Sequence, residues 1–268
     1  MKNKVIIITG ASSGIGKACA EKFGAMGAKV VLAARNIENL NEAATQLQKL
    51  NIDLLAVQCD VSKKEDCEKL INETVSKYGK IDVLINNAGI SMRALFNDTD
   101  LSVIERVMNI NFWGTVYCTK YALPYLLQSK GSVVGVSSIA GYLGLPARTG
   151  YSASKYAMQG FLDALRTENL KTGLHVMVAC PGFTASNIRN TALSSDGSAQ
   201  GESPRKEEKM MTAEEVANYI YKGVSGRKRT LVLTTEGKLA VFLGKLFPKF
   251  IEKQVFNKMA KEPDSPIK

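Results

Sequence analysis

The sequence predicts an α/β fold in which a parallel β-sheet carries helices on both of its faces. Short apolar runs rich in β-branched residues alternate along the chain with amphipathic helical stretches, and this alternation is typical of parallel sheets. The apolar runs are continuous, as expected for strands that are covered on both faces. A glycine-rich turn directly follows the first run and leads into a helix.

Seven short runs are the candidate strands of this sheet. They cover residues 5–9, 29–34, 53–59, 83–86, 132–137, 175–180 and 230–234. Between them, the stretches 39–50 and 65–78 each gather their apolar residues on one helical face. No internal repeat is visible, and the length of 268 residues suits one large domain or two small ones.

Two segments depart from this alternation. Residues 185–211 are polar and rich in turn-forming residues, and a connection of this length is usually either a functional lid, which is the prediction here, or disordered. Residues 236–268 form a basic amphipathic C-terminal extension. Pro248 interrupts its helical pattern, which predicts two short helices or a kink.

Composition limits the classes of function. No apolar run is long enough to span a membrane, and the first strand begins at Val5, so a cytoplasmic location is expected. The five cysteines form no CxxC pair and His175 is the only histidine, so no metal site is expected. Residues 222–261 hold ten Lys or Arg against two Asp or Glu, a net +8 of the total +10. The rest of the chain is nearly neutral, so no nucleic-acid partner is expected.

The turn after the first strand has the chemistry of a phosphate-binding loop. Gly10 allows a tight turn, Gly14 lets the backbone approach a pyrophosphate, and Gly16 lets the helix pack closely on the strand. The helix that begins here offers free N–H groups and a partial positive charge to a phosphate. Ser12, Ser13 and Ile15 complete the predicted cofactor-binding loop.

Arg35 ends the second predicted strand, at the place where an acidic residue would bind the ribose 2′-hydroxyl of NAD(H). A guanidinium at this position suits a 2′-phosphate. The sequence therefore predicts a preference for NADP(H) over NAD(H), with an ordinary surface arginine as the alternative interpretation.

Tyr151 and Lys155 are four residues apart, so they share one face of a predicted helix. An ammonium beside a phenol favours the phenolate form, which makes the tyrosine an acid/base group. Ser138, thirteen residues before Tyr151, supplies a second hydroxyl that can stabilise charge on a substrate oxygen. The three residues are the predicted catalytic centre.

Further motifs recur in order along the chain: residues 10–16, Cys59-Asp60-Val61, Asn86-Asn87-Ala88-Gly89, Asn111, Ser138, Tyr151, Lys155 and Pro181-Gly182. Together they resemble the short-chain dehydrogenase/reductase family over about residues 4–235. The resemblance implies a single catalytic domain over residues 1–235, built on a doubly wound (Rossmann) sheet of about seven strands. It also implies an enzyme that acts on CH–OH groups with NAD(P).

The resemblance also implies roles for individual residues. Tyr151 would be the general acid/base, Lys155 would lower its pKa and hold the nicotinamide ribose, and Ser138 would bind the substrate oxygen. Asn111 would hold a water that links Lys155 to solvent. The remaining implied cofactor contacts are Asp60 and Val61 at the adenine, Asn86, Ala88 and Gly89 at the adenosine ribose, and Pro181, Gly182, Phe183, Thr184 and Ser186 near the carboxamide.

The predicted substrate side is mostly apolar. The residues expected to face the cleft, from their position after strand ends, are Ile90, Met92, Ala94, Ile139, Leu143, Leu145 and Phe183. Arg93 and Arg148 are expected at the solvated surface. An apolar pocket under a lid favours a hydrophobic ketone or alcohol. The whole pattern resembles the branch of the family near hydroxysteroid and lipid-ketone reductases, so a steroid or long-chain keto-lipid is a plausible substrate.

The extension of residues 236–268 has three interpretations. Its apolar residues recur at three- and four-residue steps with lysines beside them. Such a face packs on the protein's own body, on a second subunit, or peripherally on an anionic membrane. The resemblance implies a homodimer or homotetramer that pairs through the helices of residues 114–128 and 153–169.

Three functions remain open from the sequence. The leading hypothesis is an NADP(H)-dependent oxidoreductase acting on a hydrophobic ketone or secondary alcohol. The second is a reductase of 3-ketoacyl groups on a carrier protein. The third is a non-catalytic cofactor-binding protein attached to a membrane, against which the complete set of catalytic residues argues.

Overall fold

The core of the protein is a parallel sheet with the strand order β3-β2-β1-β4-β5-β6-β7. The computed structural model describes residues 1–185, 188–201 and 210–267. The strands are β1 (Val5–Thr9), β2 (Lys29–Ala34), β3 (Leu54–Gln58), β4 (Val83–Asn86), β5 (Ser132–Val136), β6 (His175–Cys180) and β7 (Thr230–Val232). The chain order reverses between β1 and β4, and clefts in such sheets open at the carboxyl ends of the strands next to this switch.

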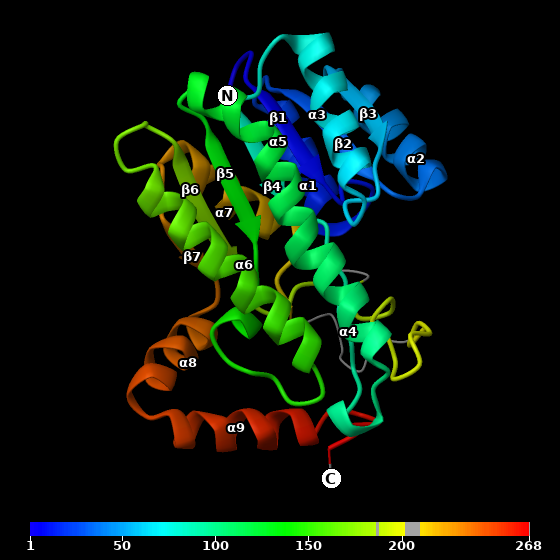
Figure 1. The fold of residues 1–268 in the computed structure, drawn as a ribbon, viewed down its shortest axis with the longest axis vertical. Helices are drawn as coiled ribbons and strands as arrows, with labels where there is room; N and C mark the ends of the chain where they lie inside the picture. The colour runs from blue at the N-terminus through cyan, green and yellow to red at the C-terminus, as the bar shows by residue number, and fades with distance from the viewer. Residues whose placement is uncertain (186–187, 202–209, 268) are drawn as a thin grey trace.

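Helices cover both faces of the sheet, as the sequence predicts (Figure 1). On one face lie α1 (Gly14–Ala25), α2 (Ile37–Gln48) and α7 (Ala213–Ser225). The other face is covered by α3 (Lys64–Tyr78), α5 (Gly114–Gln128) and α6 (Thr149–Glu168). Each layer encloses its own apolar core, which explains the continuous apolar strands.

The predicted strands are confirmed with shifts of at most two residues at their ends. The predicted helix 39–50 instead runs over Ile37–Gln48. Asn36 explains the earlier start, because its side chain accepts a hydrogen bond of 2.7 Å from the backbone N–H of Asn39.

Between β4 and β5 the chain forms one long helical segment with a local irregularity. It begins as α4 (Leu101–Met108), passes through a π-helical turn (Asn109–Trp113) and continues as α5. Such a turn widens the helix by one residue and is frequent at functional sites. Here it contains Asn111, one of the predicted catalytic residues.

The described part of the predicted lid packs against the body. Leu193 is buried, and it pairs with Met92 and with Ala199 in isolated bridges. Its backbone N–H donates to the carbonyl of Ser91 at 2.9 Å. Positions 186, 187 and 202–209 of this segment lie outside the described residues.

The C-terminal extension forms two helices, α8 (Thr235–Leu246) and α9 (Pro248–Ala260). Pro248 is the first residue of α9, so the predicted break falls where proline cannot continue a helix. Figure 1 shows both helices below the carboxyl edge of the sheet, with the C-terminus beyond α9. Across the described parts of the chain, none of the helices combines the length and apolarity needed to cross a membrane.

Candidate active site

The three predicted catalytic side chains meet beyond the carboxyl end of β5. Ser138 follows this strand and begins a short 3-10 helix (Ile139–Gly141), and its hydroxyl accepts from the N–H of Ala140 at 3.2 Å. Helix α6 carries Tyr151 and Lys155 one turn apart. The Ser138 side chain lies near that of Tyr151 and acts to lower the pKa of Tyr151. The Lys155 ammonium lies 5.7 Å from the centre of the Tyr151 ring.

Lys155 is an almost fully buried cation, with 3% of its surface exposed. Its Nζ donates to the carbonyl oxygen of Val136 at 2.9 Å. Burial penalises the charged form and lowers the pKa of Lys155 to about 8. The Lys155 ammonium can therefore release a proton more readily than the ammonium of a surface lysine can.

The electrostatics of Tyr151 differ from the sequence expectation. Burial raises the pKa of Tyr151, while the hydrogen bond from Ser138 and the charge of Arg148 act to lower it. The sequence argument expected Lys155 to lower this pKa. In the structure the Lys155 ammonium is directed to the Val136 carbonyl, so desolvation outweighs the favourable contributions.

Asn111 lies buried in the π-helical turn and joins the loop after β4 to α6. Its amide group exchanges two hydrogen bonds with the backbone of Ile90, of 2.8 and 2.9 Å, and donates to the hydroxyl of Ser154 at 2.9 Å. A Cβ on Gly89 would lie 3.1 Å from Asn111 Oδ1 and 3.5 Å from Lys155 Nζ. Asn111 therefore lies beside Lys155, with Gly89 between their polar atoms.

The glycine loop has the geometry of a phosphate cradle. Gly10 and Gly14 have φ of 65° and 51°, in the region that favours glycine. At Gly16, a Cβ would lie 2.2 Å from the carbonyl oxygen of Gly10. The side chain of Ser13 makes no cap to α1, so the first N–H groups of this helix stay available to a phosphate.

Asn87 supports this loop, a role that the sequence reasoning missed. Its Nδ2 donates to the carbonyl oxygens of Thr9 and Gly10 at 2.9 and 3.2 Å. The hydroxyl of Thr9 in turn accepts from the N–H groups of Asn87 and Ala88, both at 3.0 Å. The motif that contains Asn87 was visible in the sequence, but only the fold brings it under the loop.

A groove of about 360 Å³ runs along this loop. Most of the predicted cofactor-binding residues of the amino-terminal half line it: Gly10, Ser12, Ser13, Gly14, Ile15, Arg35, Asp60, Val61, Ala88 and Gly89. Gly16 and Asn86 instead lie in the packed interior, where Asn86 Nδ2 donates to Thr119 Oγ1 at 3.1 Å. The open groove, the glycine cradle and the uncapped helix fit a dinucleotide.

The residues after β6 divide between two environments. Pro181, Gly182 and Phe183 line a second cavity. Thr184 is buried and pairs with Met211 in a short bridge. Ser186, predicted near the carboxamide, lies outside the described residues.

The second cavity, of about 250 Å³, opens beside Ser138 and is mainly apolar. Ile139, Leu143, Leu145 and Phe183 line it as predicted, whereas Ile90 lines the cofactor groove and Met92 and Ala94 are buried elsewhere. Much of the wall comes from the C-terminal helices, which the sequence reasoning did not place at the site: Glu236, Gly237, Ala240, Val255, Lys258 and Met259. Lys258 and Glu236 form an ion pair that joins α9 to α8.

The expectation that Arg93 and Arg148 lie at the solvated surface is wrong. Their side chains are only 8% and 11% exposed, and both lie against the carboxylate of Glu262, beyond the end of α9. A distant acidic partner withdraws them from solvent, and no local pattern in the sequence indicates this pairing.

Comparisons with known proteins agree with this fold. A family model described as short chain dehydrogenase matches residues 4–196. The chain is 36% identical over 271 residues to dehydrogenase/reductase SDR family member 7B of Mus musculus, covering 99% of this chain and 84% of that protein. It is 41% identical over 187 residues to 11-beta-hydroxysteroid dehydrogenase-like 2 of Arabidopsis thaliana, covering 69% of this chain and 60% of that protein.

Solved structures show the same fold. A short chain dehydrogenase/reductase from Burkholderia phymatum in complex with NAD has a TM-score of 0.83 at 23% identity, covering 93% of this chain and 95% of that one. An alcohol dehydrogenase from Thermococcus sibiricus complexed with 5-hydroxy-NADP has a TM-score of 0.77 at 23% identity, covering 87% and 96%.

Fold, site and relatives together define a nicotinamide-dependent oxidoreductase that acts on CH–OH groups. The chain belongs to the short-chain dehydrogenase/reductase family.

Proposed function

We propose that this enzyme uses NADP(H) to interconvert a carbonyl and a secondary alcohol on a hydrophobic substrate. The observation that carries the proposal is the apolar cavity beside Ser138, whose side chain also lies near that of Tyr151. A substrate oxygen bound between these two hydroxyls would place its apolar part in the cavity.

In this proposal each catalytic residue has a defined role. The nicotinamide, when bound, supplies or accepts the hydride. Tyr151 gives a proton to the substrate oxygen in reduction and removes it in oxidation, and Ser138 stabilises the charge that develops on that oxygen. Lys155 holds the nicotinamide ribose and exchanges protons with Tyr151, and Asn111 links Lys155 to solvent.

The cavity lining favours a long apolar ketone or alcohol, such as a steroid or a keto-lipid. Its walls include Ile139, Leu143, Leu145 and Val255, and its charged lining residues Glu236 and Lys258 pair with each other. A screen of NADPH oxidation against steroids, keto-sphingoid bases, acyl-carrier substrates and small ketones tests the proposal. Turnover restricted to carrier-bound 3-ketoacyl groups would favour the second hypothesis instead.

The preference for NADP(H) is proposed from the end of β2. Arg35 is exposed and lines the groove together with Asn36 and Asn39, and its carbonyl accepts from Gln58 Nε2 at 3.1 Å. A cation with neutral amides around it suits a 2′-phosphate. We expect kcat/KM to be more than about tenfold higher with NADPH than with NADH.

Exchange of Arg35 for serine is expected to lower kcat/KM for NADPH by about tenfold or more and to leave that for NADH nearly unchanged. Initial rates with both cofactors give the ratio of kcat/KM for NADPH to kcat/KM for NADH. Arg106→Ser, in the last turn of α4, is the matched control. A preference of the unaltered enzyme for NADH would overturn this part of the proposal.

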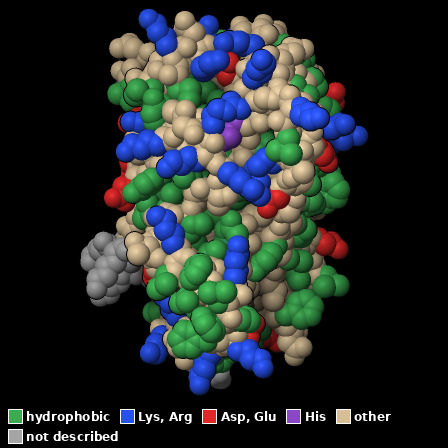
Figure 2. Space-filling view, turned by 90° about the vertical axis from the view of Figure 1, so that its left-hand side faces the viewer, with side chains coloured by type: hydrophobic (Ala, Val, Ile, Leu, Met, Phe, Trp, Pro, Cys, Tyr) green, Lys and Arg blue, Asp and Glu red, His purple; other side chains and the backbone are tan. Residues whose placement is uncertain are grey.

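We further propose peripheral membrane contact through the exposed face of α8 and the start of α9. Apolar side chains on this face are 55–60% exposed, and they are Leu239, Phe242, Leu246, Phe247 and Phe250. Figure 2 shows hydrophobic side chains with basic side chains around them at the lower end of the molecule. Apolar groups framed by cations suit an anionic bilayer surface.

Co-sedimentation with vesicles tests this contact. The protein is expected to sediment with vesicles that contain phosphatidylserine and to remain in the supernatant with purely zwitterionic ones. Phe242→Ser with Phe250→Ser is expected to abolish sedimentation, because exposed aromatic side chains supply the insertion. No association with anionic vesicles at low salt would contradict the contact.

Self-association into a dimer or tetramer is proposed through α5 and α6. Exposed aromatic side chains at these helices support it, because Trp113 and Tyr156 are 42% and 46% exposed. Light scattering during gel filtration measures the oligomeric state, and a monomer at micromolar concentration would reject the proposal.

A further inference from the structure

Glu262 is a buried carboxylate just after α9, with only 4% of its side chain exposed. Its Oε2 accepts a hydrogen bond from Arg148 Nη2 at 3.0 Å and lies 3.7 Å from Arg93 Nε. Charges are tolerated at this depth only when they are paired and hydrogen-bonded. The three residues are called the C-terminal clamp below.

Both arginines of the C-terminal clamp belong to the body of the protein, close to the site. Arg148 directly precedes α6, which carries Tyr151 and Lys155. Arg93 lies in the loop after β4, where its backbone N–H donates to the carbonyl of Leu193 at 2.8 Å. The clamp therefore joins the end of the chain to the catalytic helix and to the loop beneath the described part of the lid.

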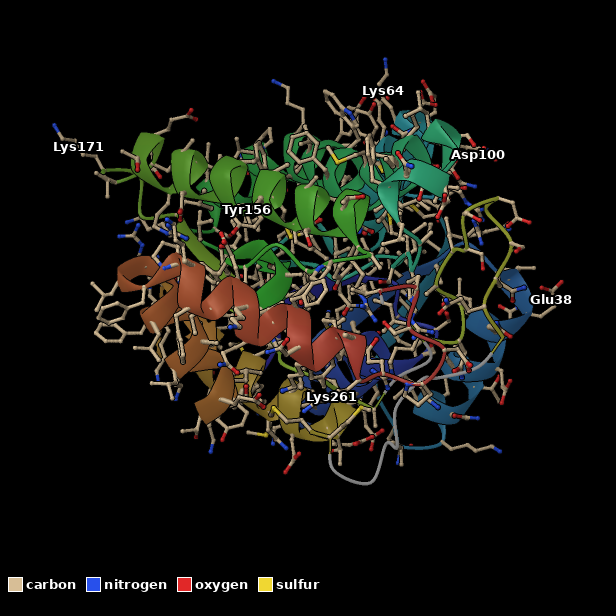
Figure 3. The ribbon with its side chains drawn as sticks, turned by 90° about the horizontal axis from the view of Figure 1, so that it is seen from below. Glu38, Lys64, Asp100, Tyr156, Lys171 and Lys261 are labelled. Atoms are coloured by element: carbon tan, nitrogen blue, oxygen red, sulfur yellow. The ribbon has the colours of Figure 1, made fainter. Side chains whose placement is uncertain are left out.

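The segment that the clamp attaches is a wall of the substrate cavity. Val255 and Met259 of α9 face this cavity. Met259 is 2% exposed and packs with Ala147 and Ile267, and its sulfur lies 4.0 Å from Arg148 Nη1. Figure 3 shows α9 crossing the underside of the molecule, with Lys261 at its end.

We propose that Glu262 is a positioning residue, whose pairing with Arg93 and Arg148 holds α9 in place as the cavity wall and so sets the preference for long apolar substrates. This inference rests on the proposed function. A small ketone needs only the Ser138 and Tyr151 end of the site, whereas a long one also needs the wall that α9 supplies.

The clamp also lies beside the acid/base group. The charged and titratable groups that face Tyr151 are Lys155, Arg148 and Cys180. Glu262 offsets part of the Arg148 charge, and that charge lowers the pKa of Tyr151. Loss of the carboxylate should lower this pKa further. Because oxidation needs the phenolate, the acidic limb of the oxidation profile should move to lower pH.

The test compares Glu262→Gln with Glu252→Gln, the same change at an exposed position of α9. The probes are 2-dodecanone and 2-butanone with NADPH. Glu262→Gln is expected to lower kcat/KM for 2-dodecanone by about tenfold or more, mainly through KM, and that for 2-butanone by less than about threefold. Hydrogen exchange of residues 248–260 should become faster, while NADPH affinity and exchange in the sheet stay unchanged. Glu252→Gln should change none of these.

Glu262→Asp keeps the charge on a shorter side chain, and it is expected to retain part of the preference for 2-dodecanone. It also serves as the test variant if Glu262→Gln fails to fold. Equal losses on both ketones, or unchanged exchange in α9, would overturn the inference. An unaltered enzyme that reduces neither ketone would contradict the proposed function, and exchange in α9 would still decide whether Glu262 holds the wall.

Discussion

Replacement of Tyr151 by phenylalanine is expected to lower kcat by roughly 10²- to 10⁴-fold, the usual contribution of a positioned general acid. The change removes only the phenol hydroxyl, which lies near Ser138. No other hydroxyl is offered by α6 at this position, because those of Ser152 and Ser154 are bonded to Leu145 and Tyr151 backbone groups. NADPH oxidation with the best ketone of the screen measures the loss.

NADPH affinity distinguishes a chemical defect from a structural one. Tyr151→Phe should bind NADPH within about threefold of the unaltered enzyme, because the groove along the glycine loop is intact. Tyr156→Phe is the matched control, since Tyr156 lies on the same helix with its side chain at the surface (Figure 3). Turnover retained in Tyr151→Phe, or lost equally in both variants, would reject the assignment.

The sheet was predictable because its signal is local. Each strand is a continuous β-branched run, and a buried parallel strand requires that composition. The ends of helices and strands were harder to predict. At α2, one hydrogen bond accepted by the Asn36 side chain decides where the helix begins. The loop at Gly10 was also predictable, since its backbone angles demand glycine.

Charges and surfaces that depend on distant partners could not be read from the sequence. Arg93 and Arg148 resemble surface residues until Glu262, more than a hundred positions later, is brought against them. The pKa of Tyr151 likewise depends on burial, which outweighs the lowering by Ser138 and Arg148.

The extension shows why an apolar helical pattern leaves its partner open. Periodicity identifies apolar residues without saying what covers them. In the structure Ile251 and Met259 are buried, and Met259 packs on Ala147 of the body, whereas Phe242 and Phe250 remain exposed. The buried face of the segment therefore fits packing on the protein's own body, and the exposed face fits contact with a membrane. Residues of α9 also line the substrate cavity.

Gly16→Ala is expected to lower the free energy of unfolding by about 1–3 kcal/mol, as overpacking in a tight interior does. The new Cβ would lie 2.2 Å from the Gly10 carbonyl oxygen and 2.6 Å from Asn87 Nδ2. The oxygen is part of the backbone and cannot rotate away, so β1 and α1 must separate. The gain of about 1 kcal/mol from the helix propensity of alanine is too small to offset this strain.

The strain should also reach the cofactor, because Gly10 and Asn87 shape the loop that lies on the groove. NADPH affinity is therefore expected to fall by about tenfold or more, a loss of about 1.4 kcal/mol. Gly160→Ala is the matched control, since Gly160 is an exposed helical glycine with open space around it. It should gain stability by up to about 1 kcal/mol and bind NADPH normally. Urea unfolding measures the free energy of unfolding, and fluorescence titration measures NADPH affinity. If Gly16→Ala stabilised the protein as much as Gly160→Ala, α1 would not need its close contact with the loop.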